Sequence, residues 1–96
     1  METTSNIIPE FEKLFRHKLQ LNNCKLRKKK QENNYEITTP AKDVFLMYWS
    51  EFPEIKLIYQ AVGIRTQQTA VYERAIRSHI NFCVTSLQES RMITSP

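Results

Sequence analysis

Glycine is nearly absent from this sequence, since Gly63 is the only one in 96 residues. Two-residue hairpin turns favour glycine, so its scarcity argues against a fold of many β-strands. A glycine-rich loop that could hold phosphate groups is excluded for the same reason. Asp43 is the only aspartate, and the glutamates lack any spacing typical of paired catalytic carboxylates. We therefore expect a protein that is not an enzyme.

Long apolar stretches are also missing. The longest unbroken one covers residues 44–49, which is too short to cross a bilayer. The first residues show no basic segment followed by an apolar one, so no secretory signal is expected. Cysteines in a chain without such a signal are more often free thiols than a disulfide. These features predict a soluble, intracellular, cytoplasmic protein without a membrane partner, in which Cys24 and Cys83 are unpaired.

Positive charge is present, and it is concentrated near the N-terminus. The formal net charge of the chain is +4. Residues 1–31 hold eight Lys and Arg and three Glu, whereas residues 32–96 hold six Lys and Arg and seven acids. A local basic excess is typical of a surface that contacts the phosphates of nucleic acid, although a solvated loop is the alternative. The candidate phosphate-binding residues are Lys25, Arg27, Lys28, Lys29 and Lys30.

Apolar residues at steps of three and four, together with capping residues, predict four helices. Thr39 followed by Pro40 is a typical helix start, because the hydroxyl caps the helix and proline suits its first turn. Thr66 is the predicted cap of the last and longest helix. The predicted helices cover approximately residues 6–21, 40–51, 54–62 and 67–88.

The whole chain is predicted to be one domain, because its length suits no more than that. The fold class that we expect is all-α, with a helix-turn-helix-like C-terminal half. The domain covers residues 1–96, with flexible ends at 1–6 and 90–96 and a basic, polar linker at 25–38.

The third and fourth predicted helices are joined at Gly63, which Ile64 follows. A glycine in a left-handed conformation, followed by an apolar residue, ends a helix and reverses the chain. Residues 54–80 therefore resemble the helix-turn-helix module of small transcription regulators, whose second helix enters the major groove of DNA. Two ordinary helices that meet at a glycine cap are the alternative. The resemblance implies contacts to bases and phosphates from Arg65, Thr66, Gln67, Gln68 and Arg74.

Two functions are compatible with these patterns. The first is a small DNA-binding regulatory protein that contacts duplex DNA through the readers above and the basic run. The second is an adaptor or inhibitor that binds a larger nucleic-acid-handling enzyme or complex. The predicted helix over residues 40–51 is more apolar than one buried side requires, so its surplus could face a protein partner or a second copy in a homodimer. The candidate interface residues are Tyr48, Trp49 and Phe52.

Zinc is the metal that this sequence could hold. His79 and Cys83 stand four residues apart on one helix face, and His17 and Cys24 would complete a tetrahedral set if the first and fourth helices met there. However, His79 and Cys83 belong to an apolar stripe, in which cysteine normally packs as a small apolar residue. We therefore expect no metal and no cofactor.

Overall fold

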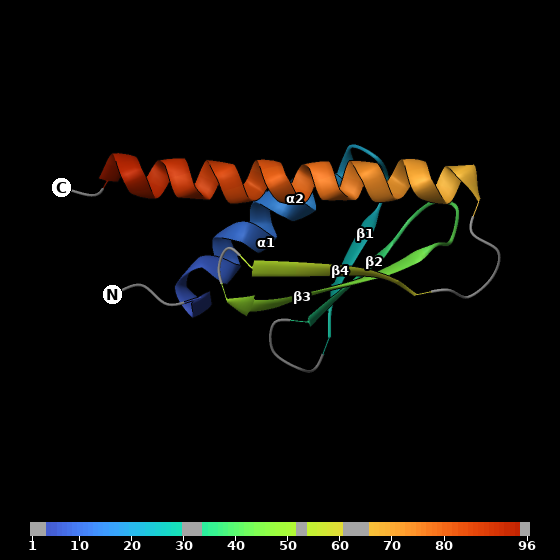
Figure 1. Cartoon of the computed structure of the whole chain (residues 1–96), viewed down its shortest axis with the longest axis horizontal. Coiled ribbons are helices and arrows are strands. Elements are labelled where there is room, and N and C mark those ends of the chain that lie inside the picture. The colour runs from blue at the N-terminus through green and yellow to red at the C-terminus, as the bar shows by residue number, and fades with distance from the viewer. Residues whose placement is uncertain (1–3, 30–33, 52–53, 61–65, 95–96) are drawn as a thin grey trace.

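The computed structural model describes residues 4–29, 34–51, 54–60 and 66–94. In this part of the chain, two helices flank four strands in sequence, and both helices lie on the same side of the sheet (Figure 1). The sheet is antiparallel, with the strand order β1-β2-β3-β4. The fold is therefore α+β, and the all-α prediction is wrong. The elements are α1 (Thr4–Gln20), β1 (Lys25–Lys28), β2 (Asn34–Thr38), β3 (Val44–Glu51), β4 (Glu54–Gln60) and α2 (Gln67–Thr94).

The central strands form because burial alternates along them. In β3, Phe45, Met47 and Trp49 are buried on the side of the helices, whereas Leu46 and Tyr48 lie on the other face and are half-buried. A period of two residues is that of a strand. The prediction of a helix over residues 40–51 is wrong because an unbroken apolar run does not reveal its period.

The edge strands replace a predicted linker and a predicted helix. β1 lies within the predicted linker, and Leu26 is the one buried residue of this strand. β4 lies where a helix over residues 54–62 is predicted, and its half-buried Ile55, Leu57 and Tyr59 pack against the core. Pairing with a neighbouring strand decides the conformation of such short segments more than local preference does.

The helix-turn-helix resemblance fails with this result, because a strand stands where its first helix should be. The turn at Gly63 lies outside the described residues, so the predicted left-handed glycine is untested there.

Thr39 and Pro40 belong to the turn between β2 and β3. The Thr39 hydroxyl oxygen accepts hydrogen bonds from the backbone amides of Ala41 and Asp43, each at 3.2 Å. Lys42 takes a left-handed backbone conformation (φ 68°), which glycine adopts more readily. The hydroxyl predicted to cap a helix therefore satisfies a turn, and this turn is made without glycine.

α1 and α2 occupy the places of the first and last predicted helices, and both extend into the predicted flexible ends, from Thr4 in α1 and to Thr94 in α2. Thr66 caps α2 as predicted, because its Oγ1 accepts the backbone amide of Thr69 at 3.2 Å. α2 has 28 residues, a length of about 42 Å in a molecule 49 Å long. The buried sides of the helices carry apolar residues at steps of three and four, which are Phe11, Phe15 and Leu19 in α1 and Ile76, Ile80, Cys83 and Leu87 in α2.

Side-chain contacts fix α2 at two places. Near its start, Thr69 Oγ1 donates to Asp43 Oδ1 at 3.0 Å, which ties the helix to the turn between β2 and β3. Farther along, His79 Nε2 lies 2.6 Å from Asn22 Oδ1, just beyond the end of α1. One face of the sheet therefore packs under the helices, and no described element covers the other face (Figure 1).

Candidate functional site

The described part of the predicted basic run folds as the edge of the sheet. Lys25, Arg27, Lys28 and Lys29 are all exposed, and β1 pairs with β2 alone. Because Leu26 points into the core, Lys25 and Arg27 point to the uncovered face and Lys28 points to the helix side. These four residues, here called the basic edge, therefore carry positive charge around both sides of one strand.

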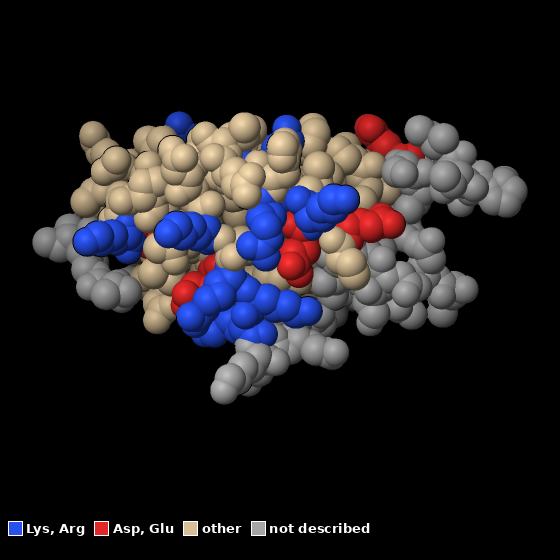
Figure 2. Space-filling model, turned by 180° about the vertical axis from the view of Figure 1, so that it is seen from behind, with Lys and Arg blue, Asp and Glu red and all other residues tan. Residues whose placement is uncertain are grey.

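Many Lys and Arg side chains lie on the face of the molecule that carries the dense group in Figure 2. Figure 2 shows a dense group of Lys and Arg side chains below the middle of this view, others in a band above it, and acidic side chains among them. Exposed cations concentrated in this way attract polyanions, and salt screens the attraction.

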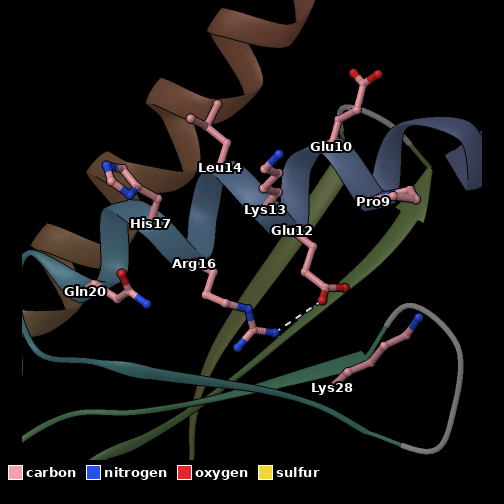
Figure 3. A pocket seen from close by; sticks show the side chains of 9 residues that line it. All are labelled: Pro9, Glu10, Glu12, Lys13, Leu14, Arg16, His17, Gln20 and Lys28. Atoms are coloured by element: carbon pink, nitrogen blue, oxygen red, sulfur yellow. Dashed lines mark hydrogen bonds and ion pairs between the residues drawn. The ribbon is translucent and has the colours of Figure 1, made fainter.

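A groove of about 840 Å³ runs between α1 and the end of β1 (Figure 3). Arg16 projects from the helix toward the sheet, and Lys28 projects from β1 toward the helix. Lys13 also lines this groove, as do Glu10 and Glu12, so α1 adds both basic and acidic side chains beside the strand.

A hydrogen-bond network fixes the wall of this groove. Arg16 Nη1 donates to the carbonyl oxygen of Leu26 at 2.8 Å, and Nη2 lies 3.2 Å from Glu12 Oε2. Tyr35 donates its hydroxyl proton to Glu12 Oε1 at 3.0 Å. Burial raises the pKa of Tyr35, and the bond to Glu12 adds to the shift, so the hydroxyl stays protonated. Arg16 is therefore held in place while its side chain stays partly exposed.

The uncovered side of the sheet, here called the open face, combines apolar and charged side chains. A second groove of about 830 Å³ is lined there by Arg27 and Lys29 together with Asn34, Leu46 and Tyr48. The register places Tyr48 between Asn34 of β2 and Lys56 of β4. By alternation, the open face carries Lys25, Arg27, Asn34, Glu36, Thr38, Val44, Leu46, Tyr48, Glu54, Lys56, Ile58 and Gln60.

Glu36 is the acidic residue of the open face beside the basic edge. Its Oε1 lies 3.8 Å from Arg27 Nε, and the two residues are register partners. Three-quarters of the Arg27 side chain is exposed, so this ion pair is weak and solvent-screened. Arg27 therefore remains accessible to another anion.

Two of the predicted DNA readers lie at the end of the sheet where Lys25 pairs with Thr38, away from Lys28 and Lys29. Gln67, Gln68 and Arg74 are exposed on α2. The first two adjoin Thr69, whose bond to Asp43 places them at the β2–β3 end of the sheet, opposite the end where Lys29 pairs with Asn34. The predicted site residues Lys30 and Arg65 lie outside the described residues.

Two of the predicted interface residues, Tyr48 and Trp49, lie on opposite faces of the sheet. Trp49 is buried, and its ring meets that of Phe11 edge to face with centroids 4.8 Å apart. Tyr48 lies on the open face, whereas Phe52 lies outside the described residues.

Both cysteines are free thiols, as predicted, and both are buried. Burial raises the pKa of Cys24, and that of Cys83 to about 11, so neither is an activated nucleophile. Within the described ranges, no three His, Cys, Asp or Glu residues are close enough together to hold a metal ion. None of the helices described is both long and apolar enough to cross a membrane.

Sequence reasoning missed Lys13 and Arg16, and it did not place Tyr48 beside the basic run. Lys13 and Arg16 are three residues apart on one helix, which signals a shared face. This shared face can be connected with the basic edge only when α1 is known to lie along β1. That tertiary contact is not visible in any local sequence pattern.

Compared with protein-family models, with curated proteins and with solved structures, the chain has no match. The function is therefore inferred from the geometry of the site.

Proposed function

We propose that this protein binds nucleic acid through the basic edge. The observation that carries this proposal is the exposure of four cations within five residues of one edge strand, beside Lys13 and Arg16 of α1. No acid interrupts these five residues. Glu12 and Glu36, which lie beside these cations, are each paired with an arginine, and Glu10 also lines the groove of α1.

The chemistry of the edge suits phosphates rather than a single small anion. Lysine side chains are flexible point charges that neutralise phosphates without reading bases. The cations are spread over both faces of the strand, so a chain of phosphates can contact several of them together. No catalytic group is needed for this role.

The test is the salt dependence of binding to short oligonucleotides. Each lost phosphate contact lowers the slope of log affinity against log salt by about 0.7 on single strands and about 0.9 on duplex. The double variant Lys28→Ala/Lys29→Ala should therefore lower both the affinity and the slope. Lys42→Ala is the matched control, since Lys42 is exposed in the turn at the other end of the sheet. An unchanged slope in the double variant would refute the proposal.

A protein partner is the second candidate, favoured by an apolar spot on the open face. Ile58 is 46% exposed and is the register partner of Leu46. A second copy of the chain is the partner that can be tested directly. Concentration-dependent dimerisation in sedimentation velocity, abolished by Ile58→Ser, would favour this function.

A further inference from the structure

A row of residues crosses the open face through Tyr48, from Lys29 at one sheet edge through Asn34 to Lys56 at the other. The chemistry of this row suits a single strand of nucleic acid. We propose that single-stranded nucleic acid lies across this row, with a base stacked on the Tyr48 ring and phosphates held by the cations at its ends. This inference rests on the proposed nucleic-acid binding and adds the class of substrate.

The row is built by strand register. Lys29 donates its backbone amide to the Asn34 carbonyl at 2.9 Å, which continues the ladder beyond β1. Asn34 faces Tyr48, and Tyr48 faces Lys56. An aromatic side chain on a central strand is thereby flanked by a cation at each sheet edge, across about 14 Å at the usual strand spacing.

Acidic residues border the row on both sides. Glu36 stands two residues after Asn34 on β2, and Glu54 stands two residues before Lys56 on β4. Because side chains two apart share a face, both carboxylates lie on the open face next to the row. Repulsion from them directs a polyanion across the strands through Tyr48 rather than along the strands.

The groove has the chemistry that an unpaired base requires. Leu46 and Tyr48 supply an apolar floor, and Asn34 lines the groove beside them. Bases stack on aromatic rings with little dependence on sequence, and nearby Lys and Arg hold the backbone. In a duplex the base faces are already stacked on one another, so a ring on a flat sheet discriminates against paired strands. The sequence alone did not suggest stacking, because no aromatic residue interrupts the basic run.

The experiment compares oligothymidine and oligouridine with a duplex of equal length, by fluorescence anisotropy. Tyr48→Val introduces a β-branched residue suited to a strand, and it should weaken single-strand binding by roughly 5- to 150-fold, the range for loss of one stacked base. Tyr48→Phe, which keeps the ring, should lose much less. Duplex affinity should change little in either variant. Phe82→Val is the matched control, because Phe82 is a half-exposed aromatic residue on α2.

The outcomes separate this inference from the proposed function. If Tyr48→Val binds single strands as well as the unaltered protein does, while Lys28→Ala/Lys29→Ala loses affinity, the stacking inference is overturned and the proposed function stands. If no oligonucleotide binds, both are overturned. Thermal unfolding of each variant checks the fold. Should Tyr48→Val unfold, the comparison passes to Lys56→Gln, which removes only the far cation and should lower the single-strand salt slope by about 0.7.

Discussion

At the scale of single residues, the open face carries acidic side chains among its basic ones. Glu36 lies 3.8 Å from Arg27 and borders the row through Tyr48. Its carboxylate repels phosphates and competes with them for the Arg27 guanidinium. An acid at such a position limits affinity, so its removal has an effect opposite in sign to that of removing a lysine.

We predict that Glu36→Gln strengthens nucleic-acid binding severalfold at low salt. The change removes a negative charge beside the site and frees Arg27, while the amide keeps the size of the side chain. The gain should shrink as salt is added, because exposed charges are screened. Anisotropy titrations at two salt concentrations measure it. Glu73→Gln is the control, since Glu73 pairs with Arg77 on α2 at 3.0 Å. Weaker binding by Glu36→Gln would contradict this picture of the face.

His79 makes the stability of the protein depend on pH. Burial lowers the pKa of His79, and the nearby positive charge of Lys18 lowers it further. The folded protein therefore resists a proton that the unfolded chain accepts below pH 6.5. The free energy of unfolding should be unaffected by this group above that pH, and it should fall as pH drops from 6.5 toward the lowered pKa.

Urea unfolding at a series of pH values between 7 and 5 measures this dependence. His79→Gln should flatten it, since glutamine does not titrate. His17→Gln removes the other histidine, whose side chain is exposed on α1, and should leave the dependence in place. The same pH slope in His79→Gln as in the unaltered protein would show that another group is responsible.

At the scale of elements, the sequence predicted the helices and missed the strands for a physical reason. The buried sides of α1 and α2 repeat at the helical period within one segment, so they can be read locally. β1 has one buried residue, Leu26, and its conformation depends on pairing with β2. β3 is apolar on both faces, which hides the period of two. The sequence therefore shows that the basic residues are close together along the chain, but their arrangement around a sheet edge could not be predicted from it.

The start of α2 is an element boundary whose contacts can be tested. Thr66 and Thr69 bond reciprocally, since the hydroxyl of each accepts the backbone amide of the other. Thr69 Oγ1 also donates to Asp43 Oδ1, and the negative charge of Asp43 suits the N-terminal end of the helix. This cluster thus joins the cap of a helix to a turn of the sheet.

We predict that Thr69→Val destabilises the protein by about 1–3 kcal/mol. The substitution preserves shape but leaves the half-buried Asp43 carboxylate without one donor, and this costs more than an ordinary hydrogen bond contributes. Thr66→Ala should cost about 1 kcal/mol, the usual effect of a lost cap. Chemical denaturation measures both, with Thr85→Val on the exposed side of α2 as the control. A neutral Thr69→Val would mean that Asp43 does not anchor the helix.

At the scale of the whole molecule, each edge strand of the sheet accepts a hydrogen bond from an arginine of a helix. Arg16 of α1 donates to the carbonyl oxygen of Leu26 on β1 at 2.8 Å. Arg77 of α2 donates to the carbonyl oxygen of Leu57 on β4 at 3.4 Å. Unpaired edge strands invite pairing with other chains, and charged side chains across an edge oppose it. The two helices therefore cover one face of the sheet and also hinder its extension at either side.

Removal of Arg77 and removal of Arg16 should therefore have different effects. Arg77→Ala should expose the β4 edge and increase self-association, without lowering nucleic-acid affinity, because Arg77 lies away from the basic edge. Arg16→Ala should weaken binding as well, since Arg16 lines the groove beside Lys28. Light scattering measures the association and anisotropy measures the binding. Arg74→Ala, at an exposed position one turn earlier on α2, removes the same charge as a control. If Arg77→Ala and Arg74→Ala associate equally, the carbonyl contact does not protect the edge. Solubility then depends only on net charge, which each variant lowers by the same amount.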